Sequence, residues 1–315
     1  MILPLDDRFA SSEISKKSDF PQSLLDLYTV DGKTYGMPKG FDTNAIFYNK
    51  ELFDNAGVAY PSDDWTWDDF VETAKKLTDP DKGIYGAALQ LDEQAGWYNT
   101  IGAFGGWVIS DDKKKSGFGD LKTQAGIQCW VDLVNEGVSP TYAQLNDTNS
   151  KTMFESGKLA MEWSGSYSVA EYLALDDFKD KINVVEVPSV EGKKSTVIHG
   201  LGNVIFAKSA HPEEAWKFVE YLGSKEAMDM QATAGIDISA RTESTHLWAE
   251  TYPEYNLKAY MNAVDYSYPY PVSSNTSGWM SPMYDEVYAA FNGDKTVEAA
   301  CTELEGTMND VLAAE

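Results

Sequence analysis

Residues 27–50 read LYTVDGKTYGMPKGFDTNAIFYNK, and this stretch decides the fold. Asp31 and Gly32 stand between two short β-prone runs, and an Asp-Gly pair is a strong hairpin signal because a type I′ turn needs positive φ at both central residues. The second strand continues through Pro38, and residues 45–48 then form a continuous apolar run. Such a run is typical of a strand covered on both faces. The stretch therefore predicts a hairpin followed by a buried strand.

Four amphipathic helices are predicted after this strand. Thr66 is placed to N-cap the first, with Asp69 at its third position. The second spans about 121–136 and ends before Gly137, and the third begins at Pro212, a residue tolerated in a first helical turn. The fourth lies near the end of the chain. The apolar positions that we expect to be buried are Trp67, Phe70, Val71, Ala74 and Leu77; Ile127, Trp130, Val131 and Val134; Ala215, Phe218, Val219 and Leu222; and Val297, Cys301, Leu304, Met308 and Val311.

Short predicted strands lie between the helices, over residues 159–162, 182–187 and 197–207. Strands that alternate with helices predict an α/β fold with largely parallel sheets. The 315 residues are enough for about two domains.

Composition excludes several classes of function. Lysine plus arginine total 25 and aspartate plus glutamate total 50, which gives a net charge of −25. This charge argues against nucleic acid or an anionic membrane as partner, since phosphates are met by clustered Lys and Arg. MILPLDDRFA lacks a basic segment followed by a long apolar one, so we expect no signal peptide on this chain. Cys129 and Cys301 are too few for a disulfide framework or a zinc site, and whether they pair stays open.

Sequence motifs of catalysis are missing. The histidines are His199, His211 and His246, and there is no G-x-S-x-G elbow, no H-E-x-x-H helix and no Walker A loop. Gly200-Leu201-Gly202 is a G-x-G without the third glycine of a dinucleotide loop. These absences remove the easily recognised enzyme classes but do not by themselves exclude an enzyme. We expect a protein that is not an enzyme and that holds no metal and no cofactor.

Aromatic residues gather at loops and strand ends, beside Gly, Ser or Asp. In α/β folds, ligands bind where strand ends meet loops, and a flat aromatic face suits the apolar face of a sugar ring. Asp42 and Arg241 would supply hydrogen-bond partners, as would the backbone near Gly165 and Gly202. Any one loop tryptophan is more often a lid on the local core, so this alternative stays open. The ligand-facing candidates are Phe41, Trp97, Tyr98, Trp107, Trp163, Tyr167 and Trp279, whereas Trp65, Trp67, Trp130, Trp216 and Trp248 are expected in the core or at its rim.

Over essentially its whole length, the chain resembles the extracellular solute-binding proteins of ABC importers, family 1, in the branch that binds sugars and oligosaccharides. Each landmark is weak alone, but their shared order and spacing are fairly specific. The landmarks are DGKTYGMPKGFDTNAIFYNKELFDNAG, WTWDDFVETAKKLTDPDKGIYGAAL, GAFGGWVISDDKKKSGF, MFESGKLAMEWSGSY, VPSVEGKK and HGLGNVIFAKSAHPEEAWKFVEYLGSKEAM.

The resemblance implies a two-lobe, type II periplasmic-binding-protein-like α/β fold with hinge-linked lobes and an interlobe cleft. The N-terminal lobe would comprise residues 1–42 and 203–260 and would lack its first part, because MILPLDDRF matches a point well inside that lobe. The C-terminal lobe would comprise 43–202 and 261–315. The implied ligand contacts are Phe41, Asp42, Trp97, Tyr98, Trp107, Trp163, Ser166, Tyr167, Gly200, Leu201, Gly202, Arg241 and Trp279.

The function that the resemblance implies is capture of a sugar or oligosaccharide without chemistry and its delivery to the membrane permease of an ABC transporter. We expect a monomer outside the cytoplasmic membrane, extracellular or periplasmic, anchored as a lipoprotein in its full-length form. Two alternatives stay open. A carbohydrate-active hydrolase would need two carboxylates about 5–10 Å apart. A binding protein for a peptide, polyamine or metal complex would be expected to show more carboxylates in its cleft.

Overall fold

The computed structural model describes residues 1–315, which form two compact units. Unit 1 comprises Met1–Thr43, Gly165–Glu171 and Ile198–Tyr270, and unit 2 comprises Asn44–Ser164, Tyr172–Val197 and Pro271–Glu315. The lobes expected from the sequence are divided at 42/43, 202/203 and 260/261. That division assigns to the second lobe four parts of unit 1, namely Thr43 and residues 165–171, 198–202 and 261–270.

The hairpin of unit 1 is confirmed. β1 (Thr29–Val30) pairs antiparallel with β2 (Lys33–Thr34), and Val30 faces Lys33 across a two-residue turn. The turn residues Asp31 and Gly32 have φ of 51° and 73°, the left-handed conformation that a type I′ turn requires.

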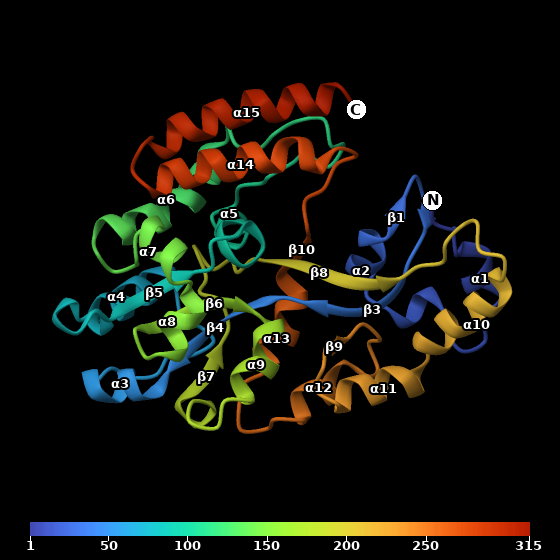
Figure 1. Ribbon diagram of the computed structural model, residues 1–315, viewed down its shortest axis with the longest axis horizontal. Helices are drawn as coiled ribbons and strands as arrows, with labels where there is room; N and C mark the ends of the chain where they lie inside the picture. Colours follow the sequence, from blue (N-terminus) through green and yellow to red (C-terminus); the bar gives the residue numbers. More distant parts are fainter. The chain divides into compact units, whose positions relative to one another are not determined.

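The main sheet of unit 1 has the order β10-β8-β3-β9. Its strands are β3 (Met37–Asp42), β8 (Thr196–Asn203, whose first two residues belong to unit 2), β9 (Ile238–Ser239) and β10 (Ser267–Pro269). β3 runs antiparallel to β8 and β9 because β3 carries the chain out of unit 1 and β8 brings it back. Helices surround this sheet (Figure 1): α1 (Asp6–Ser11), α2 (Gln22–Leu27), α10 (Pro212–Leu222), α11 (Lys225–Thr233), α12 (Thr245–Glu250) and α13 (Lys258–Asn262). The helix α9 (Val169–Leu173) has its first three residues in unit 1 and its last two in unit 2.

Unit 2 is built on a second sheet, with the order β5-β6-β4-β7. Its strands are β4 (Asn44–Asn49), β5 (Tyr85–Leu89), β6 (Leu159–Gly165) and β7 (Ile182–Val185). Every residue of β4 and β6 is buried, which confirms the covered strand predicted over residues 45–48. β5 and β6 are parallel, but β4 and β7 are antiparallel. The expectation of largely parallel sheets was therefore wrong, and both sheets mix or reverse strand directions.

Two helices of unit 2 begin or end where local signals predicted. Thr66 and Asp69 form a reciprocal capping box at the start of α4, and α6 ends just before Gly137, whose φ is 71°. No helix of the structure combines the length and apolar character needed to cross a bilayer. The helices are α3 (Lys50–Ala56), α4 (Trp67–Leu77), α5 (Tyr98–Ala103), α6 (Leu121–Asn135), α7 (Tyr142–Asp147), α8 (Ser150–Glu155), α14 (Thr276–Phe291) and α15 (Val297–Ala313), and the last two pack side by side (Figure 1).

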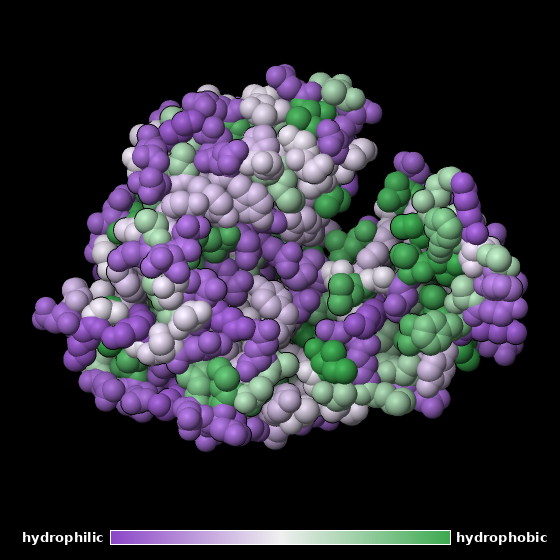
Figure 2. Space-filling view, in the orientation of Figure 1, coloured by the Kyte–Doolittle hydropathy of each residue, from purple (hydrophilic) through white to green (hydrophobic).

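Of the eighteen helix positions predicted to be buried, ten are buried, seven are half-buried and one is exposed. Phe218 on α10 is 64% exposed, so its predicted burial was wrong. Trp216 and Val219 take the buried face instead, and the edge of Trp216 meets the ring of Phe9. Hydrophilic residues predominate on the face shown in Figure 2, as the net charge of −25 leads one to expect.

Candidate functional site

Asp42, at the end of β3, is the centre of a polar cluster in unit 1. The Ser166 hydroxyl donates a 2.6 Å hydrogen bond to Asp42 Oδ1, and the backbone N–H of Tyr167 also donates to this carboxylate. His199 faces Asp42 in the register of β3 and β8, with its Nδ1 3.9 Å from Asp42 Oδ2. Residues that are 124 and 157 positions away in the sequence thus meet one carboxyl group.

Burial controls the charge of this cluster. Desolvation raises the pKa of Asp42 to about 6, against the lowering effect of the Ser166 hydrogen bond and of Lys39; Asp237 raises it further. Desolvation also lowers the pKa of His199 to about 4. At pH 7 the carboxyl group is therefore ionised and the imidazole is neutral, so Asp42 and His199 are not an ion pair despite their proximity. The cluster offers a carboxylate acceptor beside an imidazole that both donates and accepts.

Partly exposed apolar groups border the cluster. Tyr167 is 40% exposed and Leu201 is 52% exposed. The Tyr167 ring folds back over Gly165, where a Cβ would come within 2.2 Å of the ring. Gly200 and Gly202 are half-buried, and a Cβ on Gly202 would stand 2.6 Å from the Tyr28 ring. These two glycines admit the ring of Tyr28, a structural reason for the G-x-G spacing.

Two other residues of unit 1 that were predicted to contact a ligand are buried. Phe41 is 2% exposed and lies in the core. Arg241 is 8% exposed, and its guanidinium meets Asp19 at 3.1 Å and the Gly223 carbonyl at 3.1 Å. The charge of Arg241 is therefore paired inside unit 1, and its contact with a ligand stays a prediction.

The predicted contacts of unit 2 are mostly core residues. Trp163 is 1% exposed and packs at 5.8 Å against Trp130 and at 6.3 Å against Phe70. A small neighbouring residue does not place a ring at the surface when the strand or helix that carries the ring is covered. The contact of these rings with a ligand stays a prediction. Trp107 remains accessible, at 37% exposure. The other rings, each 0% exposed, are Trp97, Tyr98 and Trp279.

The sequence reasoning missed a second aromatic and acidic cluster, which lies in unit 2. Asp92 and Glu93 follow the carboxyl end of β5, and the Tyr284 hydroxyl donates to Glu93 Oε2. The half-buried rings of Tyr284 and Tyr288 are 5.4 Å apart, and Tyr142 adds a third ring 4.9 Å from Tyr288. An acidic pair that follows the short apolar run of residues 87–89, and tyrosines four residues apart near the end of the chain, were the signals that would have found it.

Burial also tunes this second cluster. Desolvation raises the pKa of Asp92 to about 6, and Glu93 raises it further, whereas the Ala95 N–H lowers it. Desolvation raises the pKa of Tyr284 and of Tyr288, so both hydroxyls keep their protons. Buried Trp97 stands edge-on to both tyrosine rings at 5.9 and 6.0 Å. Its position beneath these rings makes Trp97 a support for the cluster.

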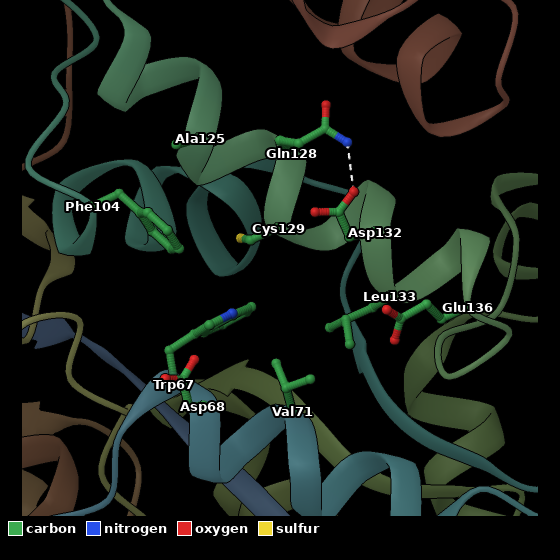
Figure 3. A pocket seen from close by; sticks show the side chains of 10 residues that line it. All are labelled: Trp67, Asp68, Val71, Phe104, Ala125, Gln128, Cys129, Asp132, Leu133 and Glu136. Atoms are coloured by element: carbon green, nitrogen blue, oxygen red, sulfur yellow. Dashed lines mark hydrogen bonds between the residues drawn. The ribbon is translucent and has the colours of Figure 1, made fainter.

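A cavity of about 380 Å³ lies between α4 and α6 (Figure 3). The rings of Trp67 and Phe104 point into it, and two of the three carboxylates that line it have partners. Asp132 accepts a 2.8 Å hydrogen bond from Gln128, and Glu136 pairs with Lys75 at 2.6 Å. No residue that was predicted to contact a ligand lines this cavity, and none of its polar groups is set in a cluster like that of Asp42. It is therefore the weaker candidate for a binding site.

Neither cysteine nor acid clusters form a metal centre in this structure. No group of three or more His, Cys, Asp and Glu side chains is placed to hold a metal ion. Cys129 and Cys301 are both buried and are not joined to each other. Desolvation raises the pKa of Cys129 and raises that of Cys301 to about 12, so both thiols stay protonated.

A family model described as bacterial extracellular solute-binding protein matches residues 1–229. Among solved structures, an ABC substrate-binding protein from Listeria monocytogenes in complex with cycloalternan is 25% identical, with a TM-score of 0.89 over 99% of this chain and 80% of that one. The α/β fold of the solute-binding type predicted from the sequence is thereby confirmed.

Curated relatives have lower coverage of their own length. The arabinooligosaccharide-binding protein of Halalkalibacterium halodurans is 28% identical over 240 residues, which are 70% of this chain and 49% of that protein. The maltooligosaccharide ABC transporter solute-binding lipoprotein of Streptococcus pneumoniae is 25% identical over 313 residues, 96% of this chain and 70% of that protein. The chain spans about half the length of the first curated relatives, 51% of a putative binding protein from Brucella abortus.

Proposed function

The chain belongs to the family of bacterial extracellular solute-binding proteins, and from this premise we propose that it captures a sugar or oligosaccharide unaltered and delivers it to the permease of an ABC transporter. The observation that carries this proposal is the Asp42 cluster, where a half-buried carboxylate, a neutral imidazole and a hydroxyl stand beside exposed apolar groups. Three similar proteins support a saccharide as the ligand class: an arabinooligosaccharide-binding protein, a maltooligosaccharide ABC transporter solute-binding lipoprotein and a substrate-binding protein in complex with cycloalternan.

The Asp42 cluster has the chemistry to bind vicinal hydroxyl groups. An ionised carboxylate accepts two hydrogen bonds from sugar hydroxyls, and such charge-assisted bonds contribute about 1.5–3 kcal/mol each. The exposed part of the Tyr167 ring suits the apolar face of a pyranose. Micromolar affinity needs about −8 kcal/mol in all, which a few such contacts reach.

In unit 2 we propose the Tyr284–Tyr288 pair, with Asp92, as a further saccharide-binding surface, and Trp107 as an additional ring. Both tyrosine rings are half-buried, so each has an accessible edge beside a carboxyl group. The interlobe cleft expected from the sequence stays a prediction that accompanies this proposal.

We further propose a monomer that acts outside the cytoplasmic membrane and is held there by a lipid anchor. The family description, bacterial extracellular solute-binding protein, supports the location. The S. pneumoniae relative is described as a lipoprotein, which supports the lipid anchor.

Isothermal titration calorimetry over linear and cyclic gluco-oligosaccharides, arabino-oligosaccharides and sugar alcohols tests the proposal. We expect micromolar binding to at least one saccharide, and about a tenfold or greater loss in Asp42→Asn because a charged acceptor is removed. Asp229→Asn is the matched control, since Asp229 of unit 1 also accepts a 2.6 Å hydrogen bond from a serine, Ser244. Absence of binding across the panel, or equal loss in both variants, would contradict the proposal.

A further inference from the structure

One short segment carries two residues of the proposed site. The chain leaves unit 2 after Ser164, passes through unit 1 as residues 165–171 and returns to unit 2 at Tyr172. Within this excursion lie Ser166 and Tyr167, both of which hydrogen-bond to Asp42. The position of these two residues therefore depends on how the ends of the excursion are held.

In unit 2, three buried side chains connect the two ends. We call Ser150, Glu162 and Tyr172 the clasp. The Ser150 hydroxyl donates a 2.8 Å hydrogen bond to Glu162 Oε1, and the Tyr172 hydroxyl donates to Glu162 Oε2. Glu162 and Tyr172 are 0% exposed and Ser150 is 2% exposed. Glu162 lies three residues before the chain leaves unit 2, and Tyr172 is the residue at which it returns.

Aromatic packing fixes the direction of the Tyr172 hydroxyl. Its ring lies 4.8 Å from the Phe47 ring in an edge-to-face contact, 5.5 Å from that of Phe154 and 5.8 Å from that of Phe178. A ring held on these sides keeps its hydroxyl aimed at Glu162. A buried carboxylate needs such donors, because burial without a hydrogen bond leaves its loss of hydration uncompensated.

In unit 1, Ser166 attaches the excursion to the end of β3. The backbone N–H of Ser166 donates a 3.1 Å hydrogen bond to the Thr43 carbonyl, while its side chain binds Asp42. The excursion is thus tied to β3 in unit 1 and anchored by the clasp in unit 2.

We propose that Glu162 is a positioning residue, and that the clasp it forms with Ser150 and Tyr172 fixes both ends of the 165–171 excursion and thereby holds Ser166 and Tyr167 on Asp42. The effect on saccharide affinity rests on the proposed function, whereas the effect on the excursion does not. The competing interpretation is that the clasp stabilises the core of unit 2 only, without influence on the excursion.

Hydrogen exchange on the unliganded chain separates these interpretations. In Tyr172→Phe we expect the Ser166 amide to exchange about tenfold faster, because the buried hydrogen bond to Glu162 is lost, while amides of β7 keep their protection. Tyr60→Phe is the matched control, since the Tyr60 hydroxyl also donates to a carboxylate of unit 2, Asp54, at 2.7 Å. Unchanged exchange at Ser166, or an equal increase throughout unit 2, would overturn the proposal. Ser150→Ala, which removes the smaller donor, gives the same comparison if Tyr172→Phe does not fold.

Calorimetry with a saccharide that binds the wild-type chain supplies the second readout. We expect Tyr172→Phe to weaken affinity about tenfold through the displaced Ser166, with no change in Tyr60→Phe. If the variant exchanges faster at Ser166 but binds as the wild type does, the positioning role for the ligand is overturned. If the wild type binds no saccharide, the proposed function fails, and the exchange result still decides whether the clasp holds the excursion.

Discussion

At Asp42, burial and hydrogen bonding act on the same carboxyl group in opposite directions. Desolvation favours the protonated form, whereas the Ser166 hydroxyl and the Tyr167 N–H favour the carboxylate, and the resulting pKa is about 6. This raised value places the change of charge just below neutral pH. A ligand whose hydroxyl groups donate to the carboxylate then competes with a proton for the same oxygens.

Saccharide affinity should therefore fall as the pH falls through about 6. Because binding requires the ionised form, the apparent affinity is divided by 1 + 10^(pKa − pH), which amounts to about tenfold at pH 5 relative to pH 7.5. Calorimetry at several pH values measures this slope. Asp42→Asn should bind weakly with no such slope, and a wild-type affinity that is constant from pH 7.5 to 5 would argue against Asp42 as the acceptor.

The buried Glu162 predicts a pH dependence of stability with a definite sign. Desolvation raises its pKa from 4.5 to about 7, while Tyr172, Ser150 and Lys151 lower it and Glu155 raises it. Between pH 4.5 and 7 the folded chain holds more protons than the unfolded chain, so the free energy of unfolding falls as the pH rises through this window. Relative to Glu162→Gln, the wild type should lose up to about 3 kcal/mol between pH 4.5 and 8. Urea denaturation at several pH values measures the difference, and a parallel pH profile in the two proteins would contradict it.

At the scale of elements, whether a tryptophan is buried depends on how the strand or loop that carries it is covered. Trp163 stands in the middle of a ring cluster formed with α4 and α6, whereas Trp107 lies outside any helix or strand. Both follow or precede small residues in the sequence, and the local pattern does not distinguish them. The two tryptophans differ because neighbouring elements cover β6 but do not cover the loop that carries Trp107.

Trp163→Ala should lower the free energy of unfolding by about 3–5 kcal/mol, since it leaves a large cavity in the core. Trp107→Ala should change it by less than about 1 kcal/mol, because the ring is 37% exposed. Chemical denaturation gives both values. A Trp163→Ala chain of wild-type stability that has lost saccharide affinity would restore the ligand contact originally predicted for this residue.

The elements that local signals specify are the ones that the sequence predicts well. The Asp31-Gly32 turn and the Thr66–Asp69 capping box depend on residues at most three positions apart, and both are present. Strand direction and the exposure of Phe218 depend on distant partners, and both predictions were wrong. The same holds for the site. Asp42 was identified from its place after a strand, but the Tyr284–Glu93 contact joins residues 191 positions apart.

For the whole molecule, the central claim is that a member of the bacterial extracellular solute-binding protein family takes up a saccharide and releases it unchanged. The net charge of −25 argues against polyanions as ligands, and the family supplies the class of function. Neither fixes the particular sugar. Within unit 1, Asp42 lies beside Ser166 and His199, and substitution of Asp42 tests the claim.

Native mass spectrometry of the chain after incubation with a mixture of oligosaccharides tests this claim most directly. We predict a complex whose mass is that of one chain plus one intact saccharide, strongly reduced in Asp42→Asn, and a released ligand of unaltered mass. Recovery of shortened saccharides, or a wild-type chain that carries none of them, would contradict it.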